Sequence, residues 1–291
     1  KKEAAKSILR TFLQYLDGGM IPNRFPDLGE KPEYNTIDAT LWLFVALHEY
    51  HEQFHDVEFI RSFFGKLTEI INAHYAGTRY NIHVTPEGLL YGGQDGTQLT
   101  WMDAKVGDYV VTPRIGCPVE INALWFNALS VYVSFGNLLG FPVSGYVQKL
   151  KDLKSVFRSH FINEKGYLND VVIPGHKADE TIRPNQVYAI SLPFSPLTNT
   201  EAKRVLDVVH QHLYTEYGLR SLSPFHPDFK PIYTGDQWHR DNAYHQGTVW
   251  GFLWGEYAMA YLNVHKYSPE SRKWVKKQSK KLEEHFYTQD G

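Results

Sequence analysis

Two kinds of helical segment alternate along this chain of 291 residues, and this alternation constrains the fold more than any other feature. In the first kind, such as residues 3–16, apolar side chains recur every three or four positions and form one stripe. In the second kind, such as residues 38–52, apolar side chains cover nearly the whole circumference. An amphipathic helix buries one face, whereas a helix that is apolar all round must be buried on most sides. The pattern therefore predicts an inner layer of apolar helices and an outer layer of amphipathic ones.

We expect nine helices in this chain, four outer–inner pairs and one further outer helix. The outer helices are amphipathic and are predicted at residues 3–16, 57–75, 142–161, 200–214 and 271–286. The inner helices are predicted at residues 38–52, 119–139, 184–192 and 247–264, of which residues 184–192 are short and only weakly polar.

The connections between these segments alternate in length as well. Links from an inner to an outer helix are short, whereas links from an outer to an inner helix are long and span residues 18–35, 76–118, 162–183 and 215–246. If neighbouring helices are antiparallel, all long links lie on one face, which is the layout of an all-α (α/α)6 toroid. We expect a single domain over residues 1–291, with small β-hairpins near residues 81–90 and 166–173. A helical solenoid is the alternative, but no repeat of 34 or 40 residues is present.

Composition excludes several function classes. Lysine and arginine total 30 against 32 aspartate and glutamate, so there is no basic surplus for nucleic acid or an anionic membrane. Cys117 is the only cysteine, which favours a reducing compartment, and we expect a cytoplasmic protein. The segment His48-Glu49-Tyr50-His51 lacks the spacing of a zinc motif. We therefore expect no metal site and no organic cofactor.

Five clusters of polar and aromatic residues mark the candidate site, each just before or at the start of an inner helix. They are YNTIDATLW at residues 34–42, TWMDAK at 100–105, TPRIGCPVEINALW at 112–125, RPNQ at 183–186 and YHQGTVW at 244–250. Any one of them is also what helix capping requires. Gathered on one face, they would form a concave site with flat rings and hydrogen-bonding groups, as a saccharide requires.

These five motifs, together with residues 21–26 and 217–224, resemble the glucosidase domain of glycogen debranching enzymes. The resemblance covers nearly the whole chain. It implies an (α/α)6 barrel and amylo-α-1,6-glucosidase activity, the hydrolysis of α-1,6-linked glucose at branch points of glycogen or a limit dextrin.

Inverting glycosidases use two carboxyl groups roughly 6.5–9.5 Å apart, one as general acid and one as general base. Asp103 is the candidate general acid, because burial beside Trp101 and Met102 would raise its pKa. The resemblance places the general acid at this aspartate too. The alternative is an ion pair between Asp103 and Lys105 or Arg114, which would lower the pKa and prevent this role.

The other predicted site residues are expected to contact sugar. Glu120 lies in the first turn of its helix and would bind a sugar hydroxyl or interact with the helix dipole. The complete substrate-binding set is Tyr34, Asn35, Asp38, Trp101, Arg114, Glu120, Asn122, Trp125, Asn185, Gln186, His245, Gln246 and Trp250.

The resemblance also implies elements outside this sequence. A closed ring has twelve helices, so nine would leave the toroid incomplete. The family's Trp-Gly-Arg-Asp motif would precede residue 1, and the glutamate that fits the general base would lie beyond Gly291. The candidates for the base within the chain are Asp241, Asp236 and Glu256, with Asp241 the least unfavourable. A true internal fragment would be inactive alone and would self-associate through the open edge of the barrel.

Two other interpretations of the motifs remain open. One is a different α/α-toroid glycosidase, of the trehalase or processing α-glucosidase type. The other is a non-catalytic helical module that binds glucan.

Overall fold

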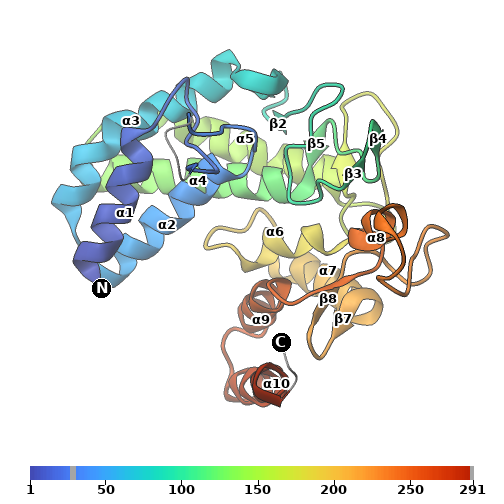
Figure 1. Cartoon of the computed structure of the whole chain (residues 1–291). Coiled ribbons are helices and arrows are strands. Elements are labelled where there is room, and N and C mark those ends of the chain that lie inside the picture. The colour runs from blue at the N-terminus through green and yellow to red at the C-terminus, as the bar shows by residue number, and fades with distance from the viewer. Residues whose placement is uncertain (27–30, 289–291) are drawn as a thin grey trace. The chain divides into compact units, whose positions relative to one another are not determined.

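The computed structural model describes residues 1–26 and 31–288 (Figure 1). Its described residues form ten α-helices and a few short strands, which confirms the all-α prediction. The chain divides into two compact units, the first made of residues 1–103 and 113–159 and the second of residues 104–112 and 160–291. The single domain over residues 1–291 stays a prediction. None of the described helices combines the length and hydropathy needed to cross a bilayer.

In the first unit, the two apolar helices pack against each other. These are α2 (Ala39–Phe54) and α4 (Val119–Leu139), and nearly every residue of α4 is buried. The amphipathic helices α1 (Lys2–Gln14) and α3 (Val57–Ala76) contact this pair with one face each. The amphipathic helix α5 (Ser144–Phe161) follows, with its first 16 residues in this unit. The predicted division into apolar and amphipathic helices is therefore confirmed here.

The second unit repeats this arrangement. The short helix α6 (Tyr188–Ser191) continues the 3-10 turn η2 (Pro184–Val187) and packs against α9 (Leu253–Val264). The amphipathic helices α7 (Asn199–Leu213) and α10 (Pro269–Thr288) both contact α9. Figure 1 shows α6 in yellow and α9 and α10 in orange to red.

Two features of the second unit differ from the prediction. The last apolar helix begins at Leu253 instead of residue 247, because β9 (Val249–Trp250) forms a three-stranded antiparallel sheet with β7 (Tyr214–Thr215) and β8 (Gly218–Arg220). The helix α8 (Gln237–Tyr244) was not predicted, since its polar sequence carries no apolar stripe. Its N-terminus is stabilised by the Asp236 carboxylate, which accepts a hydrogen bond from the backbone N–H of His239 at 3.0 Å.

The short strands lie in the long links. The predicted hairpin near residues 81–90 is confirmed as β1 (His83–Val84) paired with β2 (Leu90–Tyr91), after the turn η1 (Arg79–Asn81). A hairpin of β3 (Lys105–Val106) and β4 (Tyr109–Val110) was not predicted.

Two further strands are β5 (Cys117–Pro118) and β6 (Val171–Val172). The hairpin predicted within residues 166–173 is not formed as such. Leu168 instead bridges Ile162, and Val171 bridges Asp179, so the bridges extend beyond the predicted segment on both sides.

Candidate functional site

The first two motifs meet in the first unit. The backbone N–H of Ile37 donates to the carbonyl oxygen of Leu99 at 3.0 Å, which ties residues 34–38 to the segment that leads into Asp103. Met102 is fully buried and Trp101 half-buried, so they anchor this segment beside the aspartate.

The Asp103 residue itself is exposed, yet the atoms around its carboxyl raise its pKa through partial burial. The two cations that could have lowered this pKa have other partners. Lys105 lies 3.9 Å from Asp108, and Arg114 lies 2.5 Å from Glu120. Within residues 1–26 and 31–288, Asp103 forms no ion pair, so the geometry leaves it able to carry a proton at a higher pH than an ordinary aspartate.

Asp38 is a second carboxyl in the same region. It occupies the N-cap of α2 and is half-buried. Burial raises its pKa most, hydrogen bonds from Thr36 and from backbone N–H groups oppose this, and the charge of Asp103 raises it further. The two carboxyl groups therefore influence each other electrostatically.

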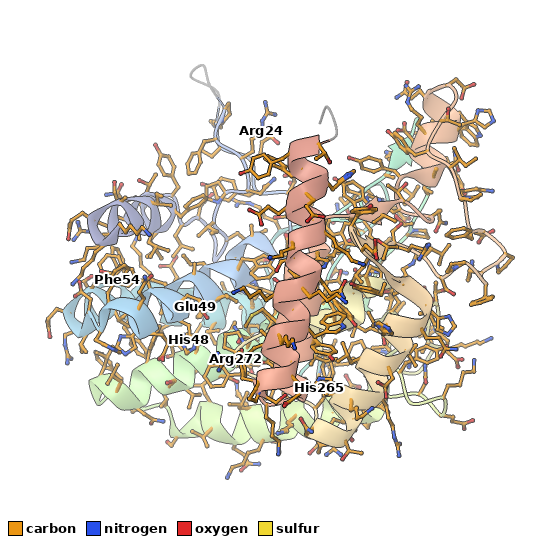
Figure 2. The ribbon with its side chains drawn as sticks, turned by 90° about the horizontal axis from the view of Figure 1, so that it is seen from below. Arg24, His48, Glu49, Phe54, His265 and Arg272 are labelled. Carbon is orange, nitrogen blue, oxygen red and sulfur yellow. The ribbon has the colours of Figure 1, made fainter. Side chains whose placement is uncertain are left out.

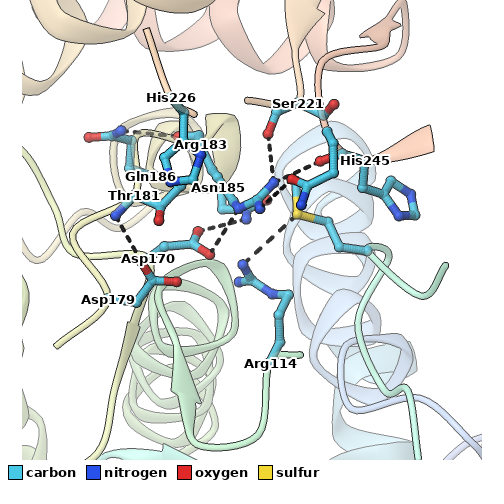
Figure 3. Close-up of polar contacts among 12 residues, drawn as sticks. Arg114, Asp170, Asp179, Thr181, Arg183, Asn185, Gln186, Ser221, His226 and His245 are labelled. Carbon is cyan, nitrogen blue, oxygen red and sulfur yellow. Dashed lines mark hydrogen bonds and ion pairs between the residues drawn. The ribbon is translucent and has the colours of Figure 1, made fainter. Parts of the chain in front are cut away.

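Arg114 and Glu120 form a buried ion pair beside this segment. Their side chains are 4% and 3% exposed, and Arg114 Nη2 lies 2.5 Å from Glu120 Oε2. Arg114 Nη1 also lies 3.9 Å from Met102 Sδ, as the dashed line in Figure 3 shows. Glu120 is in the first turn of α4, where a carboxylate is stabilised by the helix dipole. The pair connects the Arg114 loop to the start of α4.

Asn122 and Trp125 lie in the protein core, and their contact with sugar stays a prediction. The Asn122 side chain is fully buried and bonds the backbone N–H and carbonyl of Leu90 at 2.8 and 3.0 Å. Trp125 is also fully buried, donates to the carbonyl of Gly88 at 3.3 Å and stacks on His74. Both side chains hold the β1–β2 hairpin against α4.

Tyr34 and Asn35 lie nearer the surface. The Tyr34 hydroxyl donates to the carbonyl of Tyr15 at 2.7 Å, and the Arg79 guanidinium lies 4.8 Å from its ring centroid. Asn35 is exposed, and its backbone N–H donates to Asn23 Oδ1 at 3.0 Å. The Asn35 side chain is thus presented to solvent.

In the second unit, one buried arginine organises the remaining two motifs. Arg183 donates to the carbonyls of Ser221 at 3.1 Å and His245 at 2.7 Å, and to Gln246 Oε1 at 2.8 Å (Figure 3). Its Nε lies 3.8 Å from Asp170 Oδ2, and the two side chains are only 9% and 3% exposed. We call these five residues the Arg183 network.

Asn185 and Gln186 extend this network. Asn185 Nδ2 donates to Asp170 Oδ1 at 2.8 Å, while Gln186 donates to the Arg183 carbonyl at 3.0 Å and accepts from the backbone N–H of Leu168 at 3.2 Å. Both are buried, so their amide groups position the loops instead of facing solvent. Their contact with sugar stays a prediction.

The aromatic side of this motif is more open. His245 is buried, and Trp250 stacks on it with ring centroids 5.6 Å apart. Tyr244 meets Trp250 edge to face at 4.8 Å, and Trp250 donates to the carbonyl of Tyr244 at 3.1 Å. Of the residues of this motif that were predicted to contact sugar, Gln246 and Trp250 are half-buried and therefore accessible to a ligand.

The network contains three residues that the sequence analysis did not single out, Arg183, Ser221 and Asp170. Arg183 belongs to the motif RPNQ at residues 183–186. Its position directly before the start of a buried helix could have indicated a buried charge. Asp170 gave no signal, because its partner is 13 positions away and nothing local marks it as buried.

The three carboxylates proposed as alternative bases all lie in the second unit, whose helix α10, with the labelled Arg272, is in the foreground of Figure 2. Asp236 is exposed and caps α8, and its hydrogen bonds with His239 lower its pKa. Glu256 is half-buried on α9, accepts from Ser191 Oγ at 2.5 Å and has a pKa raised by burial. Asp241 is half-buried on α8. The base expected beyond Gly291 lies outside the described residues.

Comparison with known proteins identifies the family. The model of the amylo-alpha-1,6-glucosidase family matches residues 1–290. The chain is 24% identical to a glycogen debranching enzyme of Saccharomyces cerevisiae over 366 residues, an alignment that covers 94% of this chain. The chain spans about a quarter of that relative, since the alignment covers 24% of its length.

Solved structures share the fold at low sequence identity. A GH63 mannosylglycerate hydrolase from Thermus thermophilus, in complex with Tris and D-glycerate, superposes with a TM-score of 0.69 at 13% identity, covering 98% of this chain and 82% of that one. An uncharacterized conserved protein from the same organism gives a TM-score of 0.66 at 14% identity, with coverage of 98% and 81%. The chain belongs to the amylo-alpha-1,6-glucosidase family of glycoside hydrolases.

Proposed function

We propose that this chain functions in glycogen debranching, the hydrolysis of α-1,6-linked glucose at the branch points of an α-glucan such as glycogen or a limit dextrin, by an inverting mechanism with two carboxyl groups. The proposal rests on family membership together with one structural observation: a carboxyl group with a raised pKa at Asp103, next to a half-buried tryptophan and without an ion pair in the described structure. In this proposal the helices form an (α/α)6 toroid, as the alternation of apolar and amphipathic helices suggests.

The proposed reaction has a simple proton balance. Protonated Asp103 transfers its proton to the glycosidic oxygen as the bond between that oxygen and C1 breaks. A carboxylate base takes a proton from water, and the water oxygen attacks C1 from the opposite face. The products are glucose with inverted configuration at C1 and a glucan with a free hydroxyl. Asp103 leaves the step ionised and regains its proton from solvent.

The base is proposed to be the glutamate expected beyond Gly291, with Asp241 as the candidate within this chain. Asp236 is a weaker choice because it already caps α8, and Glu256 is weaker because burial raises its pKa, which disfavours the ionised form that a base requires. Tyr34, Asn35, Asp38, Trp101, Gln246 and Trp250 are proposed to contact sugar. Arg114, Glu120 and His245 are also proposed as sugar contacts, although their side chains are buried in this structure. Arg183 bonds Gln246, and His245 stacks on Trp250, so both also position residues of this set.

The experiment compares Asp103→Asn with Asp108→Asn in the intact natural polypeptide that contains this sequence. Asp108 is a fully exposed aspartate five positions away, so it controls for loss of one surface charge. We expect Asp103→Asn to lower glucose release from a limit dextrin by about 100-fold or more, and Asp108→Asn to leave it unchanged. Activity of Asp103→Asn above a few per cent would refute the assignment.

Product analysis separates the remaining enzyme classes. Glucose released from α-1,6-linked stubs supports debranching, whereas glucose released from trehalose would identify a trehalase. Binding of glycogen without turnover would identify a non-catalytic module.

A further inference from the structure

A cavity of about 790 Å³ opens in the second unit. Part of its lining belongs to the motifs at residues 217–224 and 244–250, but the lining includes none of the residues proposed to contact sugar. The cavity lies between the three-stranded sheet and the C-terminal part of α10, and we call it the sheet pocket. Its lining includes Tyr214, Tyr217, Arg220, Val249, Leu282 and His285. A volume of this size is in the range of small-molecule binding sites.

The register of the sheet places two lining residues of the sheet pocket, Arg220 and Val249, on the face opposite Trp250, whereas Tyr214 pairs with Leu219 and so shares the face of Trp250. Leu219 pairs with Trp250, and Arg220 pairs with Val249. Paired residues of neighbouring strands share a face, and successive residues of one strand face opposite sides. Arg220 and Val249 therefore point to the side of the sheet opposite Trp250 and its stacking partner His245.

An exposed aromatic ring forms one wall. Tyr217 is 46% exposed, and its ring centroid lies 4.5 Å from that of His285. Tyr214 lies deeper and is held by the rings of Tyr257 at 4.9 Å and Trp274 at 5.9 Å. The Tyr214 ring is thus held in place before a ligand binds, so this side chain loses little conformational entropy on binding.

The polar groups of the pocket suit a neutral ligand. Arg220 makes a single hydrogen bond among the described residues, from Nη1 to the carbonyl of Tyr214 at 3.4 Å, although a guanidinium has five N–H donors. At the rim, Glu216 and Lys281 form an ion pair and largely neutralise each other. Arg220 leaves a positive charge in the pocket, which disfavours a cationic ligand, and its remaining N–H groups can donate to the hydroxyl oxygens of a neutral ligand. Flat apolar rings with donors and acceptors at their edges match a chain of glucose units.

We propose that the sheet pocket is a second binding site for an α-glucan chain, separate from the site of hydrolysis. The choice of glucan as ligand rests on the proposed function. The pocket would hold an outer chain of a branched polymer while a branch point is processed elsewhere, so it would matter for polysaccharide and not for a short substrate.

Native electrophoresis in gels that contain glycogen tests this proposal. We expect Tyr217→Ala to weaken the affinity for glycogen roughly 3- to 10-fold, as the loss of one aromatic contact predicts. His285→Ala removes an exposed ring from the same wall and should also weaken the affinity for glycogen. Because the ring is exposed, its loss should have little effect on the stability of the fold. Tyr287→Ala, which removes an exposed tyrosine two positions further along α10, should leave affinity unchanged.

A second measurement locates the ligand directly. Maltoheptaose added to the protein should shift the imidazole NMR signals of His285, which are identified by their absence in His285→Ala. Inorganic phosphate at the same concentration should not. A shift with phosphate alone, or glycogen affinity within twofold of the unmodified protein for both wall variants, would overturn the proposal.

The outcomes also separate this proposal from the proposed function. If glycogen affinity depends on Tyr217 but no glucose is released, the sheet pocket stands and the debranching proposal fails. If hydrolysis of a short branched oligosaccharide and binding of glycogen both survive in Tyr217→Ala and His285→Ala, the sheet pocket fails and the debranching proposal stands.

Discussion

Replacing Arg183 with methionine should destabilise the protein strongly. The substitution removes three hydrogen bonds, to Ser221, His245 and Gln246, and the cation next to Asp170. Methionine has similar length, so the loss is mainly electrostatic. Breaking a buried ion pair by deleting one partner costs about 3–5 kcal/mol, because the other charge stays buried. We therefore expect the free energy of unfolding to fall by about 4 kcal/mol and the melting temperature by roughly 10 °C.

Urea unfolding followed by circular dichroism measures this change, and two further variants sharpen it. Arg204→Met removes an exposed arginine of the same unit and should change stability by less than about 0.5 kcal/mol. The double variant Arg183→Met with Asp170→Asn also removes the buried carboxylate that Arg183→Met leaves without its cation. It should therefore regain about 1–2 kcal/mol of the lost free energy of unfolding. A loss below about 1 kcal/mol for Arg183→Met, or no recovery in the double variant, would refute the view that this pair is buried and coupled.

Three other predictions follow from charged groups of the first unit. Arg114→Gln should lower the free energy of unfolding by about 3–5 kcal/mol, because it strands the buried Glu120 carboxylate, and an unchanged urea midpoint would contradict this. Lys6 and Lys2 hold the pKa of Asp56 well below its usual range. The ionised Asp56 therefore stabilises the fold above the unfolded-state pKa, and this stabilisation is lost as the pH falls through the folded-state pKa. In an acid titration, the free energy of unfolding of Asp56→Asn should fall less steeply with decreasing pH than that of the unmodified protein. Burial raises the pKa of Asp103, so kcat/KM should fall as pH rises through that pKa, and the stability tied to its proton should decline over the same rise. Profiles of rate and melting temperature against pH check this, and a rate that increases with pH over that range would contradict it.

Periodicity was enough to locate most helices of this chain. The apolar helix at residues 119–139 was predicted with the same bounds as α4. A run of 21 residues that is apolar on nearly every side is typical of a buried helix and leaves few other assignments of secondary structure. The polar helix α8 was missed, because its stability comes from a cap at Asp236 and from contacts with β3, neither of which is periodic. The strand at Val249–Trp250 was missed for a related reason: its partners are about 30 positions away.

The candidate site was predictable in its motifs and less so in the role of each side chain. Motifs at helix starts correctly marked where polar side chains gather in each unit. They did not distinguish Asn122, which bonds a hairpin 32 positions away, from Asn35, which faces solvent. Whether a polar side chain is available to a ligand depends on long-range hydrogen bonds, and local sequence does not encode these. The same holds for Arg183, whose side-chain hydrogen bonds reach acceptors 38 to 63 positions away.

The most direct test of the central claim asks whether Asp103 is needed for its proton. Fluoride leaves from α-glucosyl fluoride without protonation, whereas the alcohol that leaves from a glucan branch point needs an acid. In the intact natural polypeptide, Asp103→Asn should therefore lose about 100-fold or more of its activity on a limit dextrin while keeping most of its activity on the fluoride. Equal losses on both substrates would contradict the assignment of Asp103 as the general acid.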